Sequence, residues 1–291
     1  MFQGSIVALV TPMLPNGEVD WFALEALIDW HIQSGTHGIV SVGTTGESVT
    51  LTTMEQARVI EVTVEHTNGQ IPVIAGSGTN STRHAIELTR NAKLAGATAS
   101  LSVTPYYNKP PQDGLYRHFC EIAEAVDLPI VLYNVPSRTA RDMTAETVIR
   151  LAEIERIVGI KEACGDPKRV LEIREGVPND FMILSGEDAQ TLEMLHYGAV
   201  GTISVTANVV PHMMSQFCEQ YLTGNTTKAT ELDEILQPLH RVLFIDTNPI
   251  PVKWALQNMG RIQEGVRLPL IKLAPEHQAR VWEQLTKVKE L

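Results

Sequence analysis

The most reactive side chain that the sequence offers is a lysine at the end of an apolar segment. Lys161 ends residues 157–161 (Ile-Val-Gly-Ile-Lys), a short run rich in β-branched residues that is typical of a β-strand. An ammonium group loses hydration there, and desolvation lowers the pKa of a lysine and leaves more neutral amine. Neutral amine is what carbonyl chemistry through a Schiff base requires. The structural alternative is a lysine that only caps the strand and extends back to water.

Other polar side chains follow the ends of further apolar segments. Residues 43–47 (Gly-Thr-Thr-Gly-Glu) offer hydroxyls and backbone N–H groups that can hold a small carboxylate, although such runs also form ordinary turns. Tyr133 is a phenol that can move a proton, and Arg138 offers a fork for a carboxylate or a surface salt bridge. Tyr106 and Tyr107 lie in a proline-flanked loop, where packing and an interface are equally good interpretations.

Short apolar segments alternate with helix-forming segments along the chain. Strands are predicted over residues 7–10, 38–42, 72–75, 99–103, 129–133, 157–161, 181–184 and 201–205. Helices are predicted over residues 20–32, 53–68, 81–94, 113–126, 144–151, from 166 onward and over 187–196. Thr53 and Gln56 are predicted to form a capping box, and Asp166 and Pro167 to begin the sixth helix.

This alternation predicts a (β/α)₈ TIM barrel of the α/β class, because parallel strands buried on both faces read as short apolar runs. A doubly wound open sheet is the structural alternative. The barrel is expected over residues 1–224, and residues 225–291 are expected to form a C-terminal helical extension packed on it.

In such a barrel the active site lies at the C-terminal ends of the strands, so the amine, phenol, hydroxyls and guanidinium converge. Together they predict an imine-forming enzyme that acts on small carboxylates. A phosphate site is disfavoured, because residues 185–188 place two carboxylates after the seventh strand. Residues 76–81 lack the third glycine of a dinucleotide motif, and no His-Glu-x-x-His grouping suggests a metal.

Composition limits the partners of the chain. With 291 residues and a net charge of −11, the protein lacks the basic character that nucleic acid or an anionic membrane would require. No segment approaches the roughly 20 apolar residues that span a bilayer. The first five residues do not resemble a secretory signal, and the number of cysteines, 3, is odd. These features predict a cytoplasmic protein without a disulfide framework.

Five motifs together resemble the 4-hydroxy-tetrahydrodipicolinate synthase (dihydrodipicolinate synthase) family of the pyruvate-dependent class I aldolase superfamily. The resemblance covers essentially the whole chain and is carried by residues 43–47, 104–107, 133–139, 159–162 and 201–205. Arg138 separates this family from the similar sialic acid lyases and keto-deoxy-sugar aldolases. The resemblance implies a lyase that condenses pyruvate with L-aspartate 4-semialdehyde in lysine (diaminopimelate) biosynthesis.

The resemblance also implies residue roles. Lys161 would form the Schiff base with pyruvate, so no separate cofactor and no metal is expected. Tyr133 would carry protons, linked through Thr44 to Tyr107 of a neighbouring subunit. Substrate contacts would come from four further positions: Thr45 for the pyruvate carboxylate, Arg138 for the semialdehyde carboxylate, the Ile203 backbone near the imine, and Gly186, whose role, like that of Glu162, stays open.

Assembly and regulation follow from the same resemblance. The family is typically a homotetramer, a dimer of dimers with Tyr106 and Tyr107 at the tight interface. Inhibited members bind lysine there, around the positions of Ser48, Val49, Asn80, His84 and Tyr106. An acidic residue usually stands at the position of His84, and histidines often stand at those of Thr53 and Gln56, so weak or absent lysine inhibition is expected.

Two rival functions remain open at this stage. A retro-aldol lyase that cleaves a 2-keto sugar acid would use the same scaffold, although Arg138 argues against it. A catalytically silent protein that binds a small keto acid for regulation is the alternative from another class.

Overall fold

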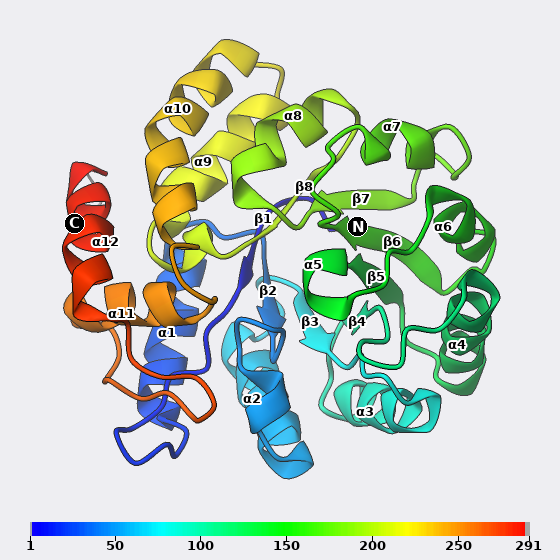
Figure 1. Ribbon diagram of the computed structural model, residues 1–291, viewed down its shortest axis with the longest axis horizontal. Helices are drawn as coiled ribbons and strands as arrows, with labels where there is room; N and C mark the ends of the chain where they lie inside the picture. The colour runs from blue at the N-terminus through cyan, green and yellow to red at the C-terminus, as the bar shows by residue number, and fades with distance from the viewer. Residues whose placement is uncertain (1, 289–291) are drawn as a thin grey trace.

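Eight parallel strands form a closed barrel at the centre of the molecule, and helices surround it (Figure 1). The computed structural model describes residues 2–288, so Met1 and the end of the predicted extension, residues 289–291, lie outside it. Neighbouring strands pair in chain order, and β1 closes the barrel against β8. The strands are β1 Gly4–Ala8, β2 Gly38–Ser41, β3 Val73–Gly76, β4 Ala99–Val103, β5 Ile130–Asn134, β6 Ile157–Glu162, β7 Met182–Ser185 and β8 Gly201–Ser204. The predicted TIM barrel is confirmed, and the open sheet is excluded.

Helices connect the strands and continue beyond the barrel. The α-helices are α1 Trp21–Gln33, α2 Thr53–Thr67, α3 Thr82–Leu94, α4 Gln112–Ala125, α5 Pro136–Thr139, α6 Ala145–Leu151, α7 Arg169–Arg174, α8 Thr191–His196, α9 Pro211–Leu222, α10 Thr226–Val242, α11 Ile250–Asn258 and α12 Pro275–Lys287. Short 3₁₀ helices are η1 Ser48–Thr50, η2 Asp188–Gln190 and η3 Thr206–Asn208. Within residues 2–288, no helix combines the length and the apolar character that a membrane crossing requires.

Local hydrogen bonds explain where two helices begin, and the capping residues predicted for both helices were wrong. The capping box of α2 joins Thr52 and Glu55, one residue earlier than predicted: the Glu55 N–H donates to Thr52 Oγ1 and the Thr52 N–H to Glu55 Oε2. Asp166 accepts from the Lys168 N–H in a separate turn, so α7 begins only at Arg169. The segment predicted as one helix over residues 187–196 is divided between η2 and α8.

Strand ends also differ from the predicted ranges. The first strand is Gly4–Ala8 and not residues 7–10. Past its end, the Val10 N–H donates to the side-chain Oδ1 of Asn208 instead of to a neighbouring strand. At β6 the ladder continues one residue past Lys161, where Glu162 still pairs with Asn134 on β5. Apolar character therefore located the strands but did not define their last residues.

The extension after α9 contacts the barrel at the loop that follows β2. Helices α10, α11 and α12 lie along one side of the molecule (Figure 1, yellow to red). Lys253 on α11 is buried, forms an ion pair with Glu47 and donates to the Thr11 carbonyl at 3.1 Å. Glu47 lies in the sequence 43–47 that was predicted to hold a carboxylate. The predicted division after residue 224 falls between α9 and α10 and stays a prediction.

Candidate active site

The structure brings Lys161 and Tyr133 together inside the barrel. They lie directly opposite each other on β6 and β5, and Lys161 Nζ is 4.4 Å from the centre of the Tyr133 ring. Their relative exposures are 6% and 7%. The alternative of a lysine that reaches solvent is therefore excluded. A buried amine and a buried phenol therefore lie side by side.

Burial changes the protonation of the Lys161 amine. Its pKa is lowered from 10.5 to about 8: desolvation is the main cause, Arg138 also lowers the pKa, and the carboxylates of Asp188 and Glu187 partly oppose the shift. A shift of this size leaves about 300-fold more neutral amine at pH 7 than an unperturbed lysine has. The side chain is therefore suited to attack a carbonyl at neutral pH.

Tyr133 is shifted in the opposite sense. Burial raises the pKa of its phenol to about 12, Glu187 raises it too, and Arg138 and a hydrogen bond with Thr44 lower it. The phenol thus stays protonated at neutral pH and can give a proton only as another is returned. Thr44 is the polar partner that can return it.

A cavity of about 400 Å³ surrounds this pair and holds most of the predicted site. It is lined by Thr44, Thr45, Tyr133, Arg138, Lys161 and Gly186, which the sequence had singled out. It is also lined by Phe244, Asp246, Thr247 and Asn248, which the sequence had not. Asn248 Nδ2 donates to Thr45 Oγ1 at 3.0 Å, and Arg138 Nη2 donates to the Asn248 carbonyl at 3.4 Å. The C-terminal extension therefore supplies one wall of the site.

The loop after β2 is held in an unusual backbone conformation. Val42 and Glu47, at its two ends, have φ of 50° and 55°, in the left-handed region that β-branched residues rarely adopt. The Thr11 hydroxyl donates to the Gly46 carbonyl at 2.7 Å, and the buried Lys253 holds the Glu47 carboxylate. These contacts hold the backbone of the loop from which Thr44 and Thr45 line the cavity.

The α5 turn places Arg138 at the rim of the cavity. Pro136 stands at the start of this short helix, where its fixed φ and missing N–H are tolerated, and Thr139 Oγ1 donates to the Val135 carbonyl at 3.2 Å. Residues 135–138, which follow the strand, indicated a site residue in the sequence, but no helix was predicted there. The guanidinium faces the same cavity as Lys161, so a carboxylate bound there would meet it.

Gly186 leaves room for the reactive lysine. A Cβ at this position would lie 3.0 Å from Lys161 Cε and 2.8 Å from Ala163 Cβ. Its backbone N–H donates to the Glu162 carbonyl at 2.7 Å, which ties the end of β7 to β6. The contribution of Gly186 is therefore steric, a role that the sequence had left open.

Two predicted site residues lie outside the set that lines this cavity. Ile203 on β8 is buried, in the apolar cluster inside the barrel that also includes Tyr133. Tyr107 is 90% exposed, with a φ of 73°. In the single chain it reaches no catalytic group through a hydrogen bond that the structure records within residues 2–288.

The predicted regulatory residues gather around a second cavity of about 240 Å³. Ser48, Val49, His84 and Tyr106 line it, with Thr53 and Gln56. Asn80 is not among the residues that line this cavity, but its Nδ2 donates to the carbonyl of Tyr106, which does line it, at 3.1 Å. Gly43, Thr44 and Tyr133 line both cavities, so the two meet at the Thr44–Tyr133 pair.

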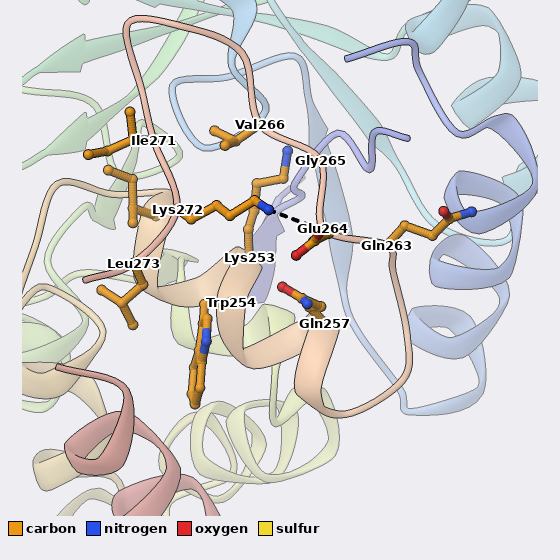
Figure 2. Close-up of a pocket in the computed structure, with 11 residues that line it drawn as sticks. Lys253, Trp254, Gln257, Gln263, Glu264, Gly265, Val266, Ile271, Lys272 and Leu273 are labelled. Atoms are coloured by element: carbon orange, nitrogen blue, oxygen red, sulfur yellow. Dashed lines mark ion pairs between the residues drawn. The ribbon is translucent and has the colours of Figure 1, made fainter. Parts of the chain in front are cut away.

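Other hollows and clusters offer weaker sites. Figure 2 shows a cavity between α11 and residues 263–273, where Lys272 pairs with Glu264 at 3.0 Å. Its volume of about 30 Å³ has room for little more than water. Among residues 2–288, no three histidine, cysteine, aspartate or glutamate side chains are grouped to hold a metal ion.

A closed barrel with a desolvated lysine beside a phenol, at the C-terminal ends of its strands, is a TIM barrel whose site is suited to Schiff-base chemistry. Residues 1–288 match the dihydrodipicolinate synthetase family. The chain belongs to this family, as its motifs predicted.

Relatives agree over nearly the whole length. A 4-hydroxy-tetrahydrodipicolinate synthase from Alcanivorax borkumensis is 55% identical over 98% of this chain and 97% of its own. One from Pseudomonas putida is 56% identical over 94% of each chain. The crystal structure of a dihydrodipicolinate synthase from Acinetobacter baumannii complexed with pyruvate has a TM-score of 0.97 and 50% identity, covering 99% of both chains.

The steric role of Gly186 is testable by Gly186→Ala. The added methyl group must displace the Lys161 stem, so we expect the rate of imine formation with pyruvate to fall about 10-fold to 100-fold, as misplaced reactive groups generally cause. Gly114→Ala in α4 is the control, because its Cβ would meet only Pro110 and Pro111 at 3.2 Å or more. Wild-type imine formation in Gly186→Ala would contradict this role.

Proposed function

We propose that the chain catalyses the 4-hydroxy-tetrahydrodipicolinate synthase reaction, the condensation of pyruvate with L-aspartate 4-semialdehyde. The observation that carries the proposal is the buried Lys161 amine, with a pKa lowered to about 8, beside Tyr133 and Thr44. A lyase of this class needs no further nucleophile. The place of the reaction in lysine biosynthesis follows from the relatives that carry this name.

The first half of the reaction activates pyruvate. The neutral Lys161 amine attacks the C2 carbonyl, and loss of water gives a protonated imine. That imine withdraws electrons from the methyl group, which releases a proton and becomes an enamine. Tyr133 and Thr44 carry the protons, since Tyr133 lies beside the amine and its phenol is hydrogen bonded with Thr44.

The second half forms the carbon–carbon bond. The enamine carbon attacks the aldehyde, whose oxygen takes a proton from Tyr133 and becomes a hydroxyl group. The amino group of the semialdehyde then attacks C2, closes the ring and expels the Lys161 amine. One enzyme amine is thus consumed and returned in each turnover.

The two substrate carboxylates bind different residues of the cavity in this proposal. Thr44 and Thr45 hold that of pyruvate, with Thr45 oriented by the amide of Asn248. Arg138 binds that of the semialdehyde, where a bidentate pair is possible. The Ile203 backbone lies near the imine in this proposal. A 2-keto sugar acid has no second carboxylate to pair with Arg138, which disfavours the retro-aldol reaction.

Self-association completes the site in this proposal. Tyr107 lies on an exposed loop in a left-handed conformation, and a second subunit would cover it and place it against the Thr44 and Tyr133 pair of its partner. A homotetramer built as a dimer of dimers is therefore inferred. A similar solved structure, with 41% identity and a TM-score of 0.96, is described as a monomeric dihydrodipicolinate synthase variant. A cytoplasmic location and the absence of nucleic-acid and membrane partners stay predictions.

Borohydride reduction in the presence of pyruvate tests the proposal directly. We expect mass spectrometry to find a pyruvate adduct on Lys161, and Lys161→Ala to lose both the adduct and the condensation. An assay with each substrate separates the rivals: turnover of a 2-keto sugar acid without turnover of the semialdehyde would favour the retro-aldol lyase. An unmodified Lys161 would defeat both enzyme functions and favour a silent binding protein.

Lysine is expected to inhibit this enzyme weakly or not at all. The cavity that would receive it presents the imidazole of His84 and the amide of Gln56, and neither supplies a fixed negative charge for an ammonium group. We expect His84→Glu to create lysine inhibition that the wild-type enzyme lacks. Strong inhibition of the wild type by millimolar lysine would contradict the prediction.

A further inference from the structure

A layer of polar side chains lies directly behind the two catalytic residues. Side chains alternate along a strand, so Asn134 and Glu162, which follow Tyr133 and Lys161, point out of the barrel. The register pairs them as it pairs Tyr133 with Lys161. Both are fully buried, at 0% and 1% exposure. A carboxylate is rarely buried so completely unless something holds it.

Hydrogen bonds join this pair across the two strands. Asn134 Nδ2 donates to Glu162 Oε1 at 3.0 Å and to Asp142 Oδ1 at 2.8 Å. Its Oδ1 accepts from the Met143 N–H at 3.0 Å, which fixes the orientation of the amide. Glu162 Oε1 also accepts from the Cys164 N–H at 2.9 Å. Each partner is thus held from two directions.

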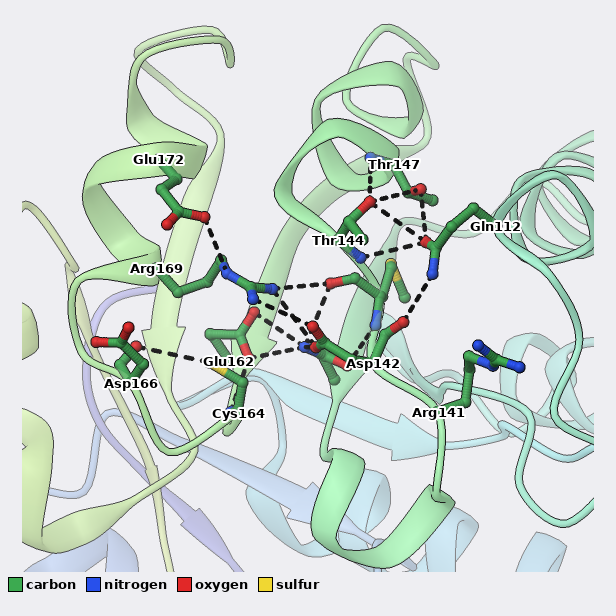
Figure 3. A network of polar contacts seen from close by, with 12 residues as sticks. Gln112, Arg141, Asp142, Thr144, Thr147, Glu162, Cys164, Asp166, Arg169 and Glu172 are labelled. Atoms are coloured by element: carbon green, nitrogen blue, oxygen red, sulfur yellow. Dashed lines mark hydrogen bonds and ion pairs between the residues drawn. The ribbon is translucent and has the colours of Figure 1, made fainter.

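An outer arginine closes the layer toward the surface (Figure 3). Arg169 at the start of α7 pairs with Asp142 at 3.1 Å and with Glu172 at 3.1 Å. It also donates to the Met143 carbonyl at 3.1 Å. The layer therefore links β5, β6, α7 and the segment that precedes α6.

Burying the Glu162 carboxylate costs free energy that an apolar side chain at this position would not cost. Burial raises the pKa of Glu162 to about 7, and Asp142 adds to this effect, while Arg169 and the side chains of Asn134 and Cys164 oppose it. Glu162 is not among the residues that line the catalytic cavity, so it does not touch the substrate. The charges that shift the pKa of Lys161 are those of Asp188, Glu187 and Arg138. What Glu162 offers the site is therefore geometry and not charge.

We propose that the Asn134–Glu162 pair is a positioning device that locks β5 to β6 and fixes the Tyr133 phenol relative to the Lys161 amine. The Glu162 carbonyl extends the lock to β7, since it accepts from the Gly186 N–H at 2.7 Å. This inference rests on the proposed function, because it concerns the step that needs both residues. The equilibrium yield of trapped imine depends chiefly on the reactivity of the Lys161 amine, whereas the rate of methyl-proton removal from the bound pyruvate also depends on Tyr133 at the correct distance.

Two measurements separate these steps. Borohydride trapping reports imine formation on Lys161, and exchange of the pyruvate methyl protons with deuterium, followed by NMR, reports proton removal. Glu162→Leu removes the acceptor and keeps the bulk, and Asn134→Leu removes the donor. Glu162→Gln keeps an oxygen that can accept from both Asn134 and Cys164. The control is Thr89→Val on α3, which removes hydrogen bonds to Ser77 and Ala85 in the equivalent layer behind β3 and β4.

The proposal predicts a loss confined to the second step. In Glu162→Leu and Asn134→Leu the exchange rate should fall about 10-fold to 100-fold relative to the yield of trapped imine. Glu162→Gln should stay near the wild-type ratio. Thr89→Val should lower the melting temperature and leave the ratio unchanged.

Three results would overturn it. A wild-type ratio in Glu162→Leu would show a role in stability only, and a Glu162→Gln as defective as Glu162→Leu would show a role for the charge. If the leucine variants fail to fold, Arg169→Met replaces them, because it removes the ion pair that holds Asp142 against Asn134. An unchanged ratio of exchange rate to trapped imine in that variant would equally contradict the proposal. A wild-type protein that traps no pyruvate would instead defeat the proposed function.

Discussion

The desolvation of one amine is the constraint on which the rest of this molecule depends. Lys161 is useful only if water is kept from it, because hydration would return its pKa to the ordinary range near 10.5. The closed barrel reduces the exposed fraction of Lys161 to 6%. The same enclosure also keeps the Tyr133 phenol protonated. One physical effect thus prepares both the nucleophile and the proton carrier.

Placement of these two residues is achieved from outside the barrel. Inward side chains do the chemistry, and the outward neighbours in the same strands, Asn134 and Glu162, hold the strands together. The C-terminal extension acts similarly on the loop after β2, through the Lys253–Glu47 ion pair and the Asn248 amide. Residues far apart in the chain therefore determine how well the catalytic groups are oriented, which is the requirement for preorganised catalysis.

The sequence predicted the features that follow from hydrophobic periodicity and from the positions of the strand ends. Lys161, Tyr133, Arg138 and the Thr44–Thr45 pair could be grouped because parallel strands end on one face of a barrel. Asn248 could not be found in this way, since its contact with Thr45 spans 203 residues and carries no local signal. Glu162 was noticed, but a strand pattern does not reveal which polar partners lie behind it. The family predicted from the motifs and the barrel predicted from the alternation of strands and helices are confirmed.

The pH dependence of imine formation tests the central claim most directly. The second-order rate with pyruvate can be followed by rapid mixing and borohydride quenching, between pH 6 and pH 11. Because only the neutral amine attacks, the rate should rise with pH and level off above a midpoint at a pKa of about 8. A rate that kept rising through pH 10 would show that Lys161 is hydrated and would contradict the account.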